Sequence, residues 1–294
     1  MIVDAHVHLW DPEHTPQPWM TSEHAAIARP FGPEDLRPHL EHNGIHAVVL
    51  VQGACVDSDT DYLISEASRH DWIAAVTAWL ALDEPERARA RLDELGKHQA
   101  FRAVRHLIHN EDDPHWILRA EVLESLALRE ERDILLELPV VFPRHLGDIP
   151  RLAERFPRLR LVIDHLGKPP LGTDDLEPWE RDLRAAAACP NVLAKLSGLN
   201  TATARRDWRV DDLLPACGAA LDAFGPDRLL CGSDWPVALL NGDDDRVWTA
   251  TRQIAEAIAG ADADGLLGEN AARVYRFTDA RTTTSAGESA WRHR

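Results

Sequence analysis

The chain has 294 residues and a formal charge of −17, because 49 Asp and Glu outnumber 32 Lys and Arg. A surface this acidic repels phosphate backbones and anionic lipid headgroups, which excludes nucleic-acid and membrane partners and leaves a small-molecule substrate, with or without assembly into a homo-oligomer. No apolar stretch approaches the roughly 20 residues of a membrane span, and residues 1–20 lack the basic start and apolar core of a signal peptide, so we expect a cytoplasmic protein.

The four cysteines are Cys55, Cys189, Cys217 and Cys231, and none forms a CxxC pair. Most lie in apolar surroundings, as buried reduced thiols do. The sequence therefore predicts neither a disulfide framework nor a cysteine metal site.

Short apolar runs rich in β-branched residues alternate with longer segments of helical period. The predicted strands are 2–8, 47–52, 73–80, 103–108, 134–138, 160–165, 192–197 and 228–233. The predicted helices are 33–43, 59–69, 84–98, 116–131, 146–156, 179–188, 211–224, 246–259 and 262–275. Eight strand–helix alternations without a long linker are typical of a parallel sheet, and they predict an α/β protein with a single (β/α)8 barrel domain.

Two segments do not follow this alternation. Residues 10–31 are rich in Pro, Trp and His, and we expect them to form a loop over the mouth of the barrel. Residues 279–294 have almost no apolar side chains, and we expect a disordered C-terminal tail. The barrel domain is thus predicted to span residues 1–278.

Polar residues fall at the carboxyl ends of several predicted strands, where barrel enzymes carry their catalytic groups. His6 and His8 end the first strand and are two residues apart, so on an extended chain they project to the same side. His165 ends the sixth strand and Asp234 follows the eighth. These four side chains are expected to face one point on the barrel axis, and their donor atoms suit one divalent ion such as Zn or Mn.

Five further residues at strand ends or in the first loop are predicted to bind substrate: Arg105, His106, Trp10, Gln52 and Lys195. The planar guanidinium of Arg105 suits a carboxylate or vicinal hydroxyls. Alternation along a regular strand places His106 on the opposite face from Arg105. For Lys195, pairing with a barrel carboxylate is the alternative to a direct role.

Two sets of neighbouring residues have open roles. Lys168 is expected, like Lys195, to pair with a carboxylate of the barrel rather than to take part directly. Asp4 and Asp164 lie beside the site histidines in the sequence, where they either orient the rings or cap local structure.

Five runs in this order resemble the amidohydrolase superfamily, and within it the branch of sugar-lactone and dicarboxylate lactonases. They are VDAHVHLWD, FRAVRHLI, VIDHLGKPP, AKLSGLN and CGSDWPV, and the resemblance extends from Met1 to about Phe277. It implies a (β/α)8 (TIM) barrel that hydrolyses cyclic esters. It also implies that His6, His8, His165 and Asp234 occupy active-site positions.

The sequence departs from this family along the fifth predicted strand. Sugar lactonases of the branch carry an acidic and a basic residue where this chain has Leu138 and Phe142, which leaves the identity of the lactone open. Binuclear members use a carboxylated Lys or a Glu on strand four or five, and here only Glu137 could bridge two metals. At most one ion is therefore expected, and the resemblance also implies that metal-independent activity is possible in this branch.

The available groups predict a mechanism. Asp234 would stay ionised and act as the general base toward water. His6, His8 and His165 would polarise the lactone carbonyl and stabilise the oxyanion, directly or through a bound ion. The predicted function is a metal-dependent or metal-free hydrolase that opens the lactone of a sugar acid or related carboxylate.

Two other function classes are alternatives to this prediction. A metal-dependent non-oxidative decarboxylase of an unsaturated or aromatic acid could use the same barrel, although HLGKPP and GSDWP favour the lactonases. A binding protein or inactive relative is disfavoured because the set of three histidines and one aspartate is intact. No GxSxG, phosphate loop or GxGxxG supports serine-hydrolase or nucleotide chemistry.

Overall fold

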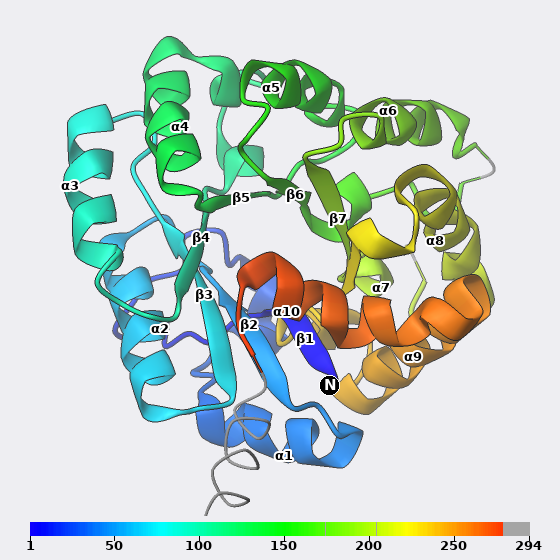
Figure 1. Ribbon diagram of the computed structural model, residues 1–294. Coiled ribbons are helices and arrows are strands. Elements are labelled where there is room, and N and C mark those ends of the chain that lie inside the picture. The colour runs from blue at the N-terminus through cyan, green and yellow to red at the C-terminus, as the bar shows by residue number, and fades with distance from the viewer. Residues whose placement is uncertain (174, 204, 279–294) are drawn as a thin grey trace, which may run out of the picture.

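The computed structural model describes residues 1–173, 175–203 and 205–278, so the predicted tail at 279–294 lies outside the described residues. Eight parallel strands form one sheet in which each strand neighbours the next in chain order. They are β1 Val3–Val7, β2 Ala47–Val51, β3 Ile73–Trp79, β4 Phe101–Arg105, β5 Leu135–Leu138, β6 Leu161–Ile163, β7 Val192–Leu196 and β8 Leu229–Cys231. The strands form an inner ring with helices around it, which confirms the predicted (β/α)8 barrel (Figure 1).

The helices follow the predicted order, apart from one short helix at Leu199–Ala202 that the sequence does not predict. They are α1 Pro33–Asn43, α2 Asp57–Arg69, α3 Pro85–Leu95, α4 Ala120–Arg132, α5 Ile149–Arg155, α6 Glu177–Ala187, α7 Leu199–Ala202, α8 Val210–Phe224, α9 Asp244–Ala259 and α10 Asn270–Tyr275. The predicted helix 116–131 is split, because Arg119 has an extended backbone between a short turn at Trp116–Leu118 and α4. The predicted helix 262–275 likewise divides into a π-helical turn at Gly265–Glu269 and α10.

The barrel closes where the carboxyl ends of β1 and β8 meet. Val7 and Trp235 form a parallel bridge, the His8 N–H donates to the Trp235 carbonyl at 2.7 Å, and the Asp234 N–H donates to the His6 carbonyl at 2.9 Å. The backbone hydrogen bonds that close the barrel therefore also fix His6 and His8 beside Asp234.

The amino-terminal end of the barrel is covered by α10, which crosses the opening in Figure 1. Its Tyr275 is completely buried and donates a hydrogen bond of 2.5 Å to Glu137 Oε1 in the barrel interior. The preceding turn lies so close to β1 that a Cβ on Gly268 would stand 2.0 Å from the Met1 carbonyl oxygen. Glycine is thus required there for the C-terminal segment to close the barrel.

Replacing Tyr275 with phenylalanine is expected to lower the free energy of unfolding by about 1–3 kcal/mol, because Glu137 then loses a buried hydrogen-bond donor. Urea denaturation of purified Tyr275→Phe measures this difference. Tyr62 is half-buried, and its hydroxyl has no hydrogen bond to the described residues, so Tyr62→Phe is the matched control. Equal stability losses in the two variants would contradict a specific role for the Tyr275 hydroxyl.

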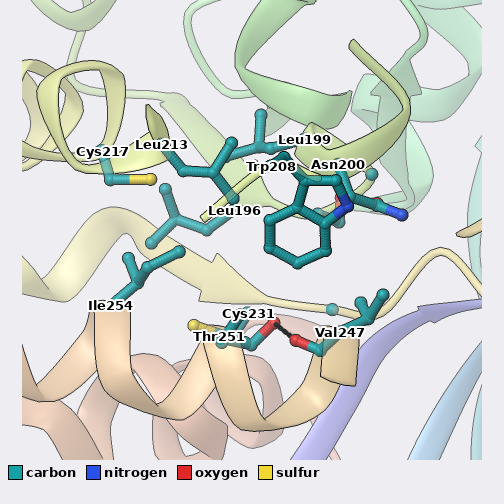
Figure 2. A pocket seen from close by; sticks show the side chains of 14 residues that line it. Leu196, Leu199, Asn200, Trp208, Leu213, Cys217, Cys231, Val247, Thr251 and Ile254 are labelled. Carbon is teal, nitrogen blue, oxygen red and sulfur yellow. Dashed lines mark hydrogen bonds between the residues drawn. The ribbon is translucent and has the colours of Figure 1, made fainter. Parts of the chain in front are cut away.

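A small apolar cavity of about 30 Å³ lies between β7, β8, α8 and α9 (Figure 2). Cys217 and Cys231 line it as free thiols, and Thr251 donates its hydroxyl hydrogen to the Val247 carbonyl. Among the described residues, no Asp, Glu, His, Lys or Arg faces this cavity. It is a packing defect of the outer layer, and acid–base chemistry must take place elsewhere.

All four cysteines are free, as the sequence predicts. Among the described residues, no helix is long and apolar enough to cross a membrane.

Candidate active site

The structure brings the four predicted site residues together at the carboxyl end of the barrel. His6 Nε2 lies 3.2 Å from His8 Nε2 and 3.6 Å from Asp234 Oδ1. The same carboxylate oxygen lies 3.3 Å from His8 Nε2 and 4.0 Å from His165 Nε2. Three imidazole nitrogens and one carboxylate oxygen therefore converge on a common point.

Left-handed backbone turns hold two of these side chains in place. The sequence predicts His165 at the end of a strand, but β6 ends at Ile163, and His165 lies in a turn with φ 54°. Leu166 continues the turn with φ 53°, and Asp234 has φ 65°. Left-handed conformations are costly for residues other than glycine, and they persist where surrounding packing fixes them, often at functional sites.

Gly198 allows Asp234 and His165 to approach each other. Its φ is +60°, and a Cβ at this position would lie 2.6 Å from Asp234 Oδ2 and 2.7 Å from His165 Nδ1. Both distances are shorter than any real Cβ contact. A side chain here would displace the carboxylate or the imidazole.

Backbone carbonyls orient two of the three histidines. His8 Nδ1 lies 2.8 Å from the Val51 carbonyl oxygen, and His165 Nδ1 lies 3.1 Å from the Ser197 carbonyl oxygen. A carbonyl oxygen only accepts, so His8 donates from Nδ1 and presents Nε2 to the site. His165 Nδ1 also has the Ser197 hydroxyl oxygen at 2.9 Å, and its Nε2 faces Asp234. This is the ring orientation of histidines that bind metals.

A buried group of charges lies directly beneath His6. Lys195 Nζ is 3.2 Å from His6 Nδ1 and 2.6 Å from Glu137 Oε2. Arg105 Nε lies 3.0 Å from Asp164 Oδ2, in a contact that is not aligned as a hydrogen bond. Two cations and two carboxylates thus compensate each other in a region almost closed to solvent.

This environment sets the ionisation of the site. Burial would raise the pKa of Asp234, but the facing His165, His8 and His6 outweigh it and hold that pKa below its usual range. Burial lowers the pKa of both His6 and His165. The site therefore offers an ionised carboxylate that faces three imidazoles.

A pocket of about 280 Å³ opens onto this constellation. It is lined by His8, Trp10, Trp19, His24, Gln52, Gly53, Arg105, Leu107, His109, Asn110, His165, Lys168, Thr201, Asp234 and Val237. Trp10, Trp19 and His24 belong to the long segment after β1, which confirms the predicted loop over the barrel mouth.

Three of the five predicted substrate-binding residues line this pocket, namely Trp10, Gln52 and Arg105. Lys195 does not, because its ammonium lies below His6 and binds Glu137, which agrees with the carboxylate-pairing alternative. His106 is directed away from the pocket.

The surroundings of His106 account for its direction. Trp79 Nε1 donates to His106 Nδ1 at 3.1 Å, and His106 Nε2 lies 2.7 Å from Glu111 Oε1. The ring also stacks on Trp116 with centroids 4.2 Å apart. Alternation after Arg105 is the sequence signal that indicates this outward direction.

Several pocket residues are missing from the sequence-based prediction. Trp19 lies in a turn, His24 and Asn110 lie in short 3-10 helices, and Thr201 lies in the four-residue helix α7. Segments this short carry no periodicity or spacing that marks their residues as part of the pocket. Lys168 is marked by the HLGKPP run, but the structure shows no carboxylate partner for it among the described residues.

His109 also lines the pocket, and its Nδ1 lies 3.2 Å from the Pro139 carbonyl oxygen. Burial, with a contribution from Lys168 and Arg105, lowers the pKa of His109 to about 3. It therefore faces the substrate as a neutral ring that can exchange hydrogen bonds with hydroxyl groups.

The converging donors could hold a divalent metal ion. His6, His165 and Asp234 each offer a ligand atom within 4.8 Å of the others, and His8 Nε2 faces the same point. Nitrogen and carboxylate donors of this kind suit zinc, and the carbonyl partners of His8 and His165 fit that use.

A second group with ligand spacing comprises His6, Glu137 and Asp164. Both oxygens of Glu137 already accept hydrogen bonds, Oε1 from Thr77 and Tyr275 and Oε2 from Lys195. The carboxylate that could bridge two metals is therefore engaged with protein donors.

Comparison with known proteins agrees with this geometry. A family model described as Amidohydrolase matches residues 3–277. The chain is 37% identical over 282 residues to an L-fucono-1,5-lactonase of Burkholderia ambifaria, covering 94% of this chain and 95% of the relative. It is 35% identical over 288 residues to an L-fucono-1,5-lactonase of Burkholderia multivorans, covering 94% and 96%.

A solved structure shows the same similarity in three dimensions. It is the crystal structure of an amidohydrolase from Burkholderia multivorans with bound Zn, with a TM-score of 0.87 and 34% identity. The match covers 95% of this chain and 100% of that chain. The matched length, the barrel and the converging histidines and aspartate together show that this chain belongs to the amidohydrolase family.

Proposed function

We propose that this protein is a lactonase, a hydrolase of carbohydrate metabolism that opens the cyclic ester of a sugar acid or related carboxylate. The observation that carries the proposal is the ionised Asp234, which lines a pocket of about 280 Å³ and faces three histidine Nε2 atoms. Ester hydrolysis requires a base and polarising groups at one carbon atom. The two relatives at 37% and 35% identity are L-fucono-1,5-lactonases, which supports the same reaction here and gives no support to the decarboxylase alternative.

Asp234 is the general base of the proposed reaction. A water molecule beside its carboxylate loses a proton to Asp234 as the water oxygen bonds to the lactone carbonyl carbon. The tetrahedral intermediate then collapses, the ring C–O bond breaks, and the proton returns from Asp234 to the departing ring oxygen. The product is a hydroxy acid, whose carboxyl group releases the second proton of the water to the solvent and becomes a carboxylate.

The histidines orient and polarise the lactone carbonyl at the point where they converge with Asp234. His6, His8 and His165 are rigidly placed, since each has a partner on the far side of its ring. A divalent ion held by these three residues and Asp234 would supply Lewis-acid polarisation when bound. Because Glu137 already accepts hydrogen bonds from Thr77 and Lys195, we expect no more than one ion to bind.

The rest of the pocket suits a polyhydroxylated ring. Gln52, His109, Asn110 and Thr201 provide hydrogen-bonding groups on its wall, and Trp10 provides an aromatic surface. The positions that depart from the lactonase pattern, Leu138 and Phe142, are not among the described lining residues. Their change from charged to apolar therefore does not argue against a sugar lactone.

A panel of substrates tests the proposed function. Purified protein is incubated with L-fucono-1,5-lactone, other aldonolactones and 2-pyrone-4,6-dicarboxylate, and a pH indicator follows acid release against enzyme-free lactone. Dihydroxybenzoates with detection of CO2 form the decarboxylase arm. The expected result is acid release from at least one sugar lactone without CO2 release from the acids; the reverse pattern would refute the proposal.

Replacing Gly198 with alanine is expected to lower kcat/KM by about a hundredfold. The new Cβ would push Asp234 or His165 out of position, and a shift of about 1 Å in a catalytic group has an effect of this size. Gly218→Ala is the matched control, since a Cβ there has no described atom within 4 Å and its helix gains a better helix former. Steady-state kinetics on the lactone identified in the panel gives the comparison. Equal kinetics for the two variants would show that the close approach at Gly198 has no role in the reaction.

Metal analysis of the protein as purified is expected to find no more than one Zn or Mn per chain. Chelator treatment followed by activity measurement then separates two cases. Loss of activity that zinc restores assigns carbonyl polarisation to the ion, and full activity in metal-free protein assigns it to the side chains. Two tightly bound ions per chain would contradict the single-ion prediction.

A further inference from the structure

Lys168 differs from the other basic side chains around the site. Arg105 has Asp164 Oδ2 at 3.0 Å, and Lys195 has Glu137 Oε2 at 2.6 Å. Lys168 lines the pocket, yet no carboxylate oxygen of the described residues lies within 4.0 Å of its Nζ, and none of them accepts a hydrogen bond from it. The charges of Arg105 and Lys195 are thus compensated inside the protein, whereas the charge of Lys168 is not.

The backbone holds Lys168 in a fixed position. The His165 carbonyl accepts a hydrogen bond of 2.9 Å from the Lys168 N–H, and Lys168 itself has φ 53°. Pro169 and Pro170 follow directly and restrict the chain further. One rigid turn therefore carries both a histidine of the site and the lysine.

The ammonium shares the pocket with the reacting groups. Lys168 interacts electrostatically with Asp234, and it is one of the charges that act on His165. Lys168 is an exposed residue, and it is one of the residues that line the pocket. The other lining residue with a permanent charge is Arg105, which pairs with Asp164.

The negative charge of Asp234 and the positive charge of Lys168 suit different parts of one reaction. This inference rests on the proposed lactonase function. We propose that Lys168 is a catalytic residue whose ammonium stabilises the oxyanion formed on the lactone carbonyl oxygen. Lys168 lines the same pocket as His165 and Asp234, so its ammonium adds a full positive charge to the groups that surround the reacting carbonyl.

The step balances without a further reactant. As the water oxygen bonds to the carbonyl carbon, the C=O electron pair moves onto the carbonyl oxygen, and Asp234 takes the proton of the water. The negative charge on that oxygen is greatest in the tetrahedral intermediate, next to the Lys168 ammonium. Collapse returns the electron pair to the C=O bond as the ring C–O bond breaks, and the departing ring oxygen takes the proton from Asp234. Lys168 keeps its protons throughout.

Lys168→Met tests this role, with Lys97→Met as the matched control because Lys97 is an exposed lysine outside the pocket. Loss of one oxyanion-stabilising group is expected to lower kcat about 100- to 1000-fold, and the effect on KM should be smaller. Lys168→Arg, which keeps the charge, should recover part of the loss, and Lys97→Met should match the wild type. A kcat for Lys168→Met within about threefold of the wild type would overturn the proposal.

The pH profile separates a charge effect from a structural one. Desolvation in the pocket lowers the pKa of Lys168, and the positive charge of Arg105 lowers it further. The negative charges of Asp234 and Asp164 act in the opposite direction. The ammonium is lost as pH rises, so wild-type kcat should fall at alkaline pH, while Lys168→Arg should shift this fall to higher pH because guanidinium stays charged. An alkaline limb unchanged in Lys168→Arg would overturn the proposal.

The design keeps this inference distinct from the lactonase proposal. Each variant is measured on a lactone that the wild-type protein opens. If the wild type opens no lactone in the panel, the proposed function itself fails. If it opens one and Lys168→Met is unimpaired, only the role of Lys168 fails.

Discussion

Replacing Asp234 with asparagine is expected to lower kcat by at least about a hundredfold, the lower range for loss of a general base. Asparagine preserves the shape of the side chain but cannot take a proton from water. The facing histidines hold the pKa of Asp234 below its usual range, so the wild-type carboxylate is available as a base at neutral pH. Steady-state kinetics on the lactone found in the panel measures the effect.

The control for this variant is Asp262→Asn, which makes the same chemical change at an exposed position. Thermal unfolding should show that Asp234→Asn remains folded. If Asp234→Asn retains near wild-type turnover, Asp234 is not the base and the proposed mechanism is wrong.

Replacing Arg105 with methionine is expected to lower the free energy of unfolding by about 3–5 kcal/mol, because removing one partner of a buried pair leaves Asp164 short of a cation. Asp164 is completely buried, and Lys195 at 3.6 Å then remains as its lysine partner. Lys195, Arg105 and His6 offset the effect of burial and hold the pKa of Asp164 well below its usual range, so the carboxylate stays ionised in the folded protein. Urea denaturation at neutral pH measures the loss.

Arg205→Met serves as the control, because Arg205 forms an exposed ion pair with Asp207 and should contribute no more than about 1 kcal/mol. The double variant Arg105→Met/Asp164→Asn should recover part of the stability, since it removes the unpaired charge as well. An Arg105→Met protein as stable as Arg205→Met would show that the buried pair is not needed for folding.

The sequence was sufficient to predict the order of the elements and the four converging residues. Eight apolar runs mark the strands, and the carboxyl ends of parallel strands meet at one end of a barrel. His6 and His8 share a face because they are two residues apart along an extended chain. This reasoning required only strand positions accurate to within a few residues.

The height of a side chain along the barrel axis could not be predicted in this way. Lys195 was expected to contact substrate, but it lies one layer below the pocket, beside Glu137. Strand alternation shows that a residue points inward, whereas its height depends on the stagger between neighbouring strands, which the sequence does not display.

Backbone turns were a second limit on prediction from sequence. β6 is shorter than expected, and His165 and Lys168 reach the pocket from left-handed conformations that hydrophobic periodicity does not indicate. Trp19 in a turn and Asn110 at the end of a short 3-10 helix carry no periodic signal either, and only the folded chain shows that they line the pocket.

The most direct test of the account is a single turnover in H2¹⁸O with enzyme in excess over the lactone. Asp234-activated attack of water on the carbonyl predicts one ¹⁸O atom in the product carboxylate, none in the new hydroxyl group, and an unlabelled Asp234. Mass spectrometry of the product and of the peptide containing Asp234 reads out all three, with the enzyme-free lactone as background. An unlabelled product with ¹⁸O in Asp234 would instead show direct attack by the carboxylate, and label in the hydroxyl group would show cleavage of the other ring C–O bond; either result would contradict the mechanism.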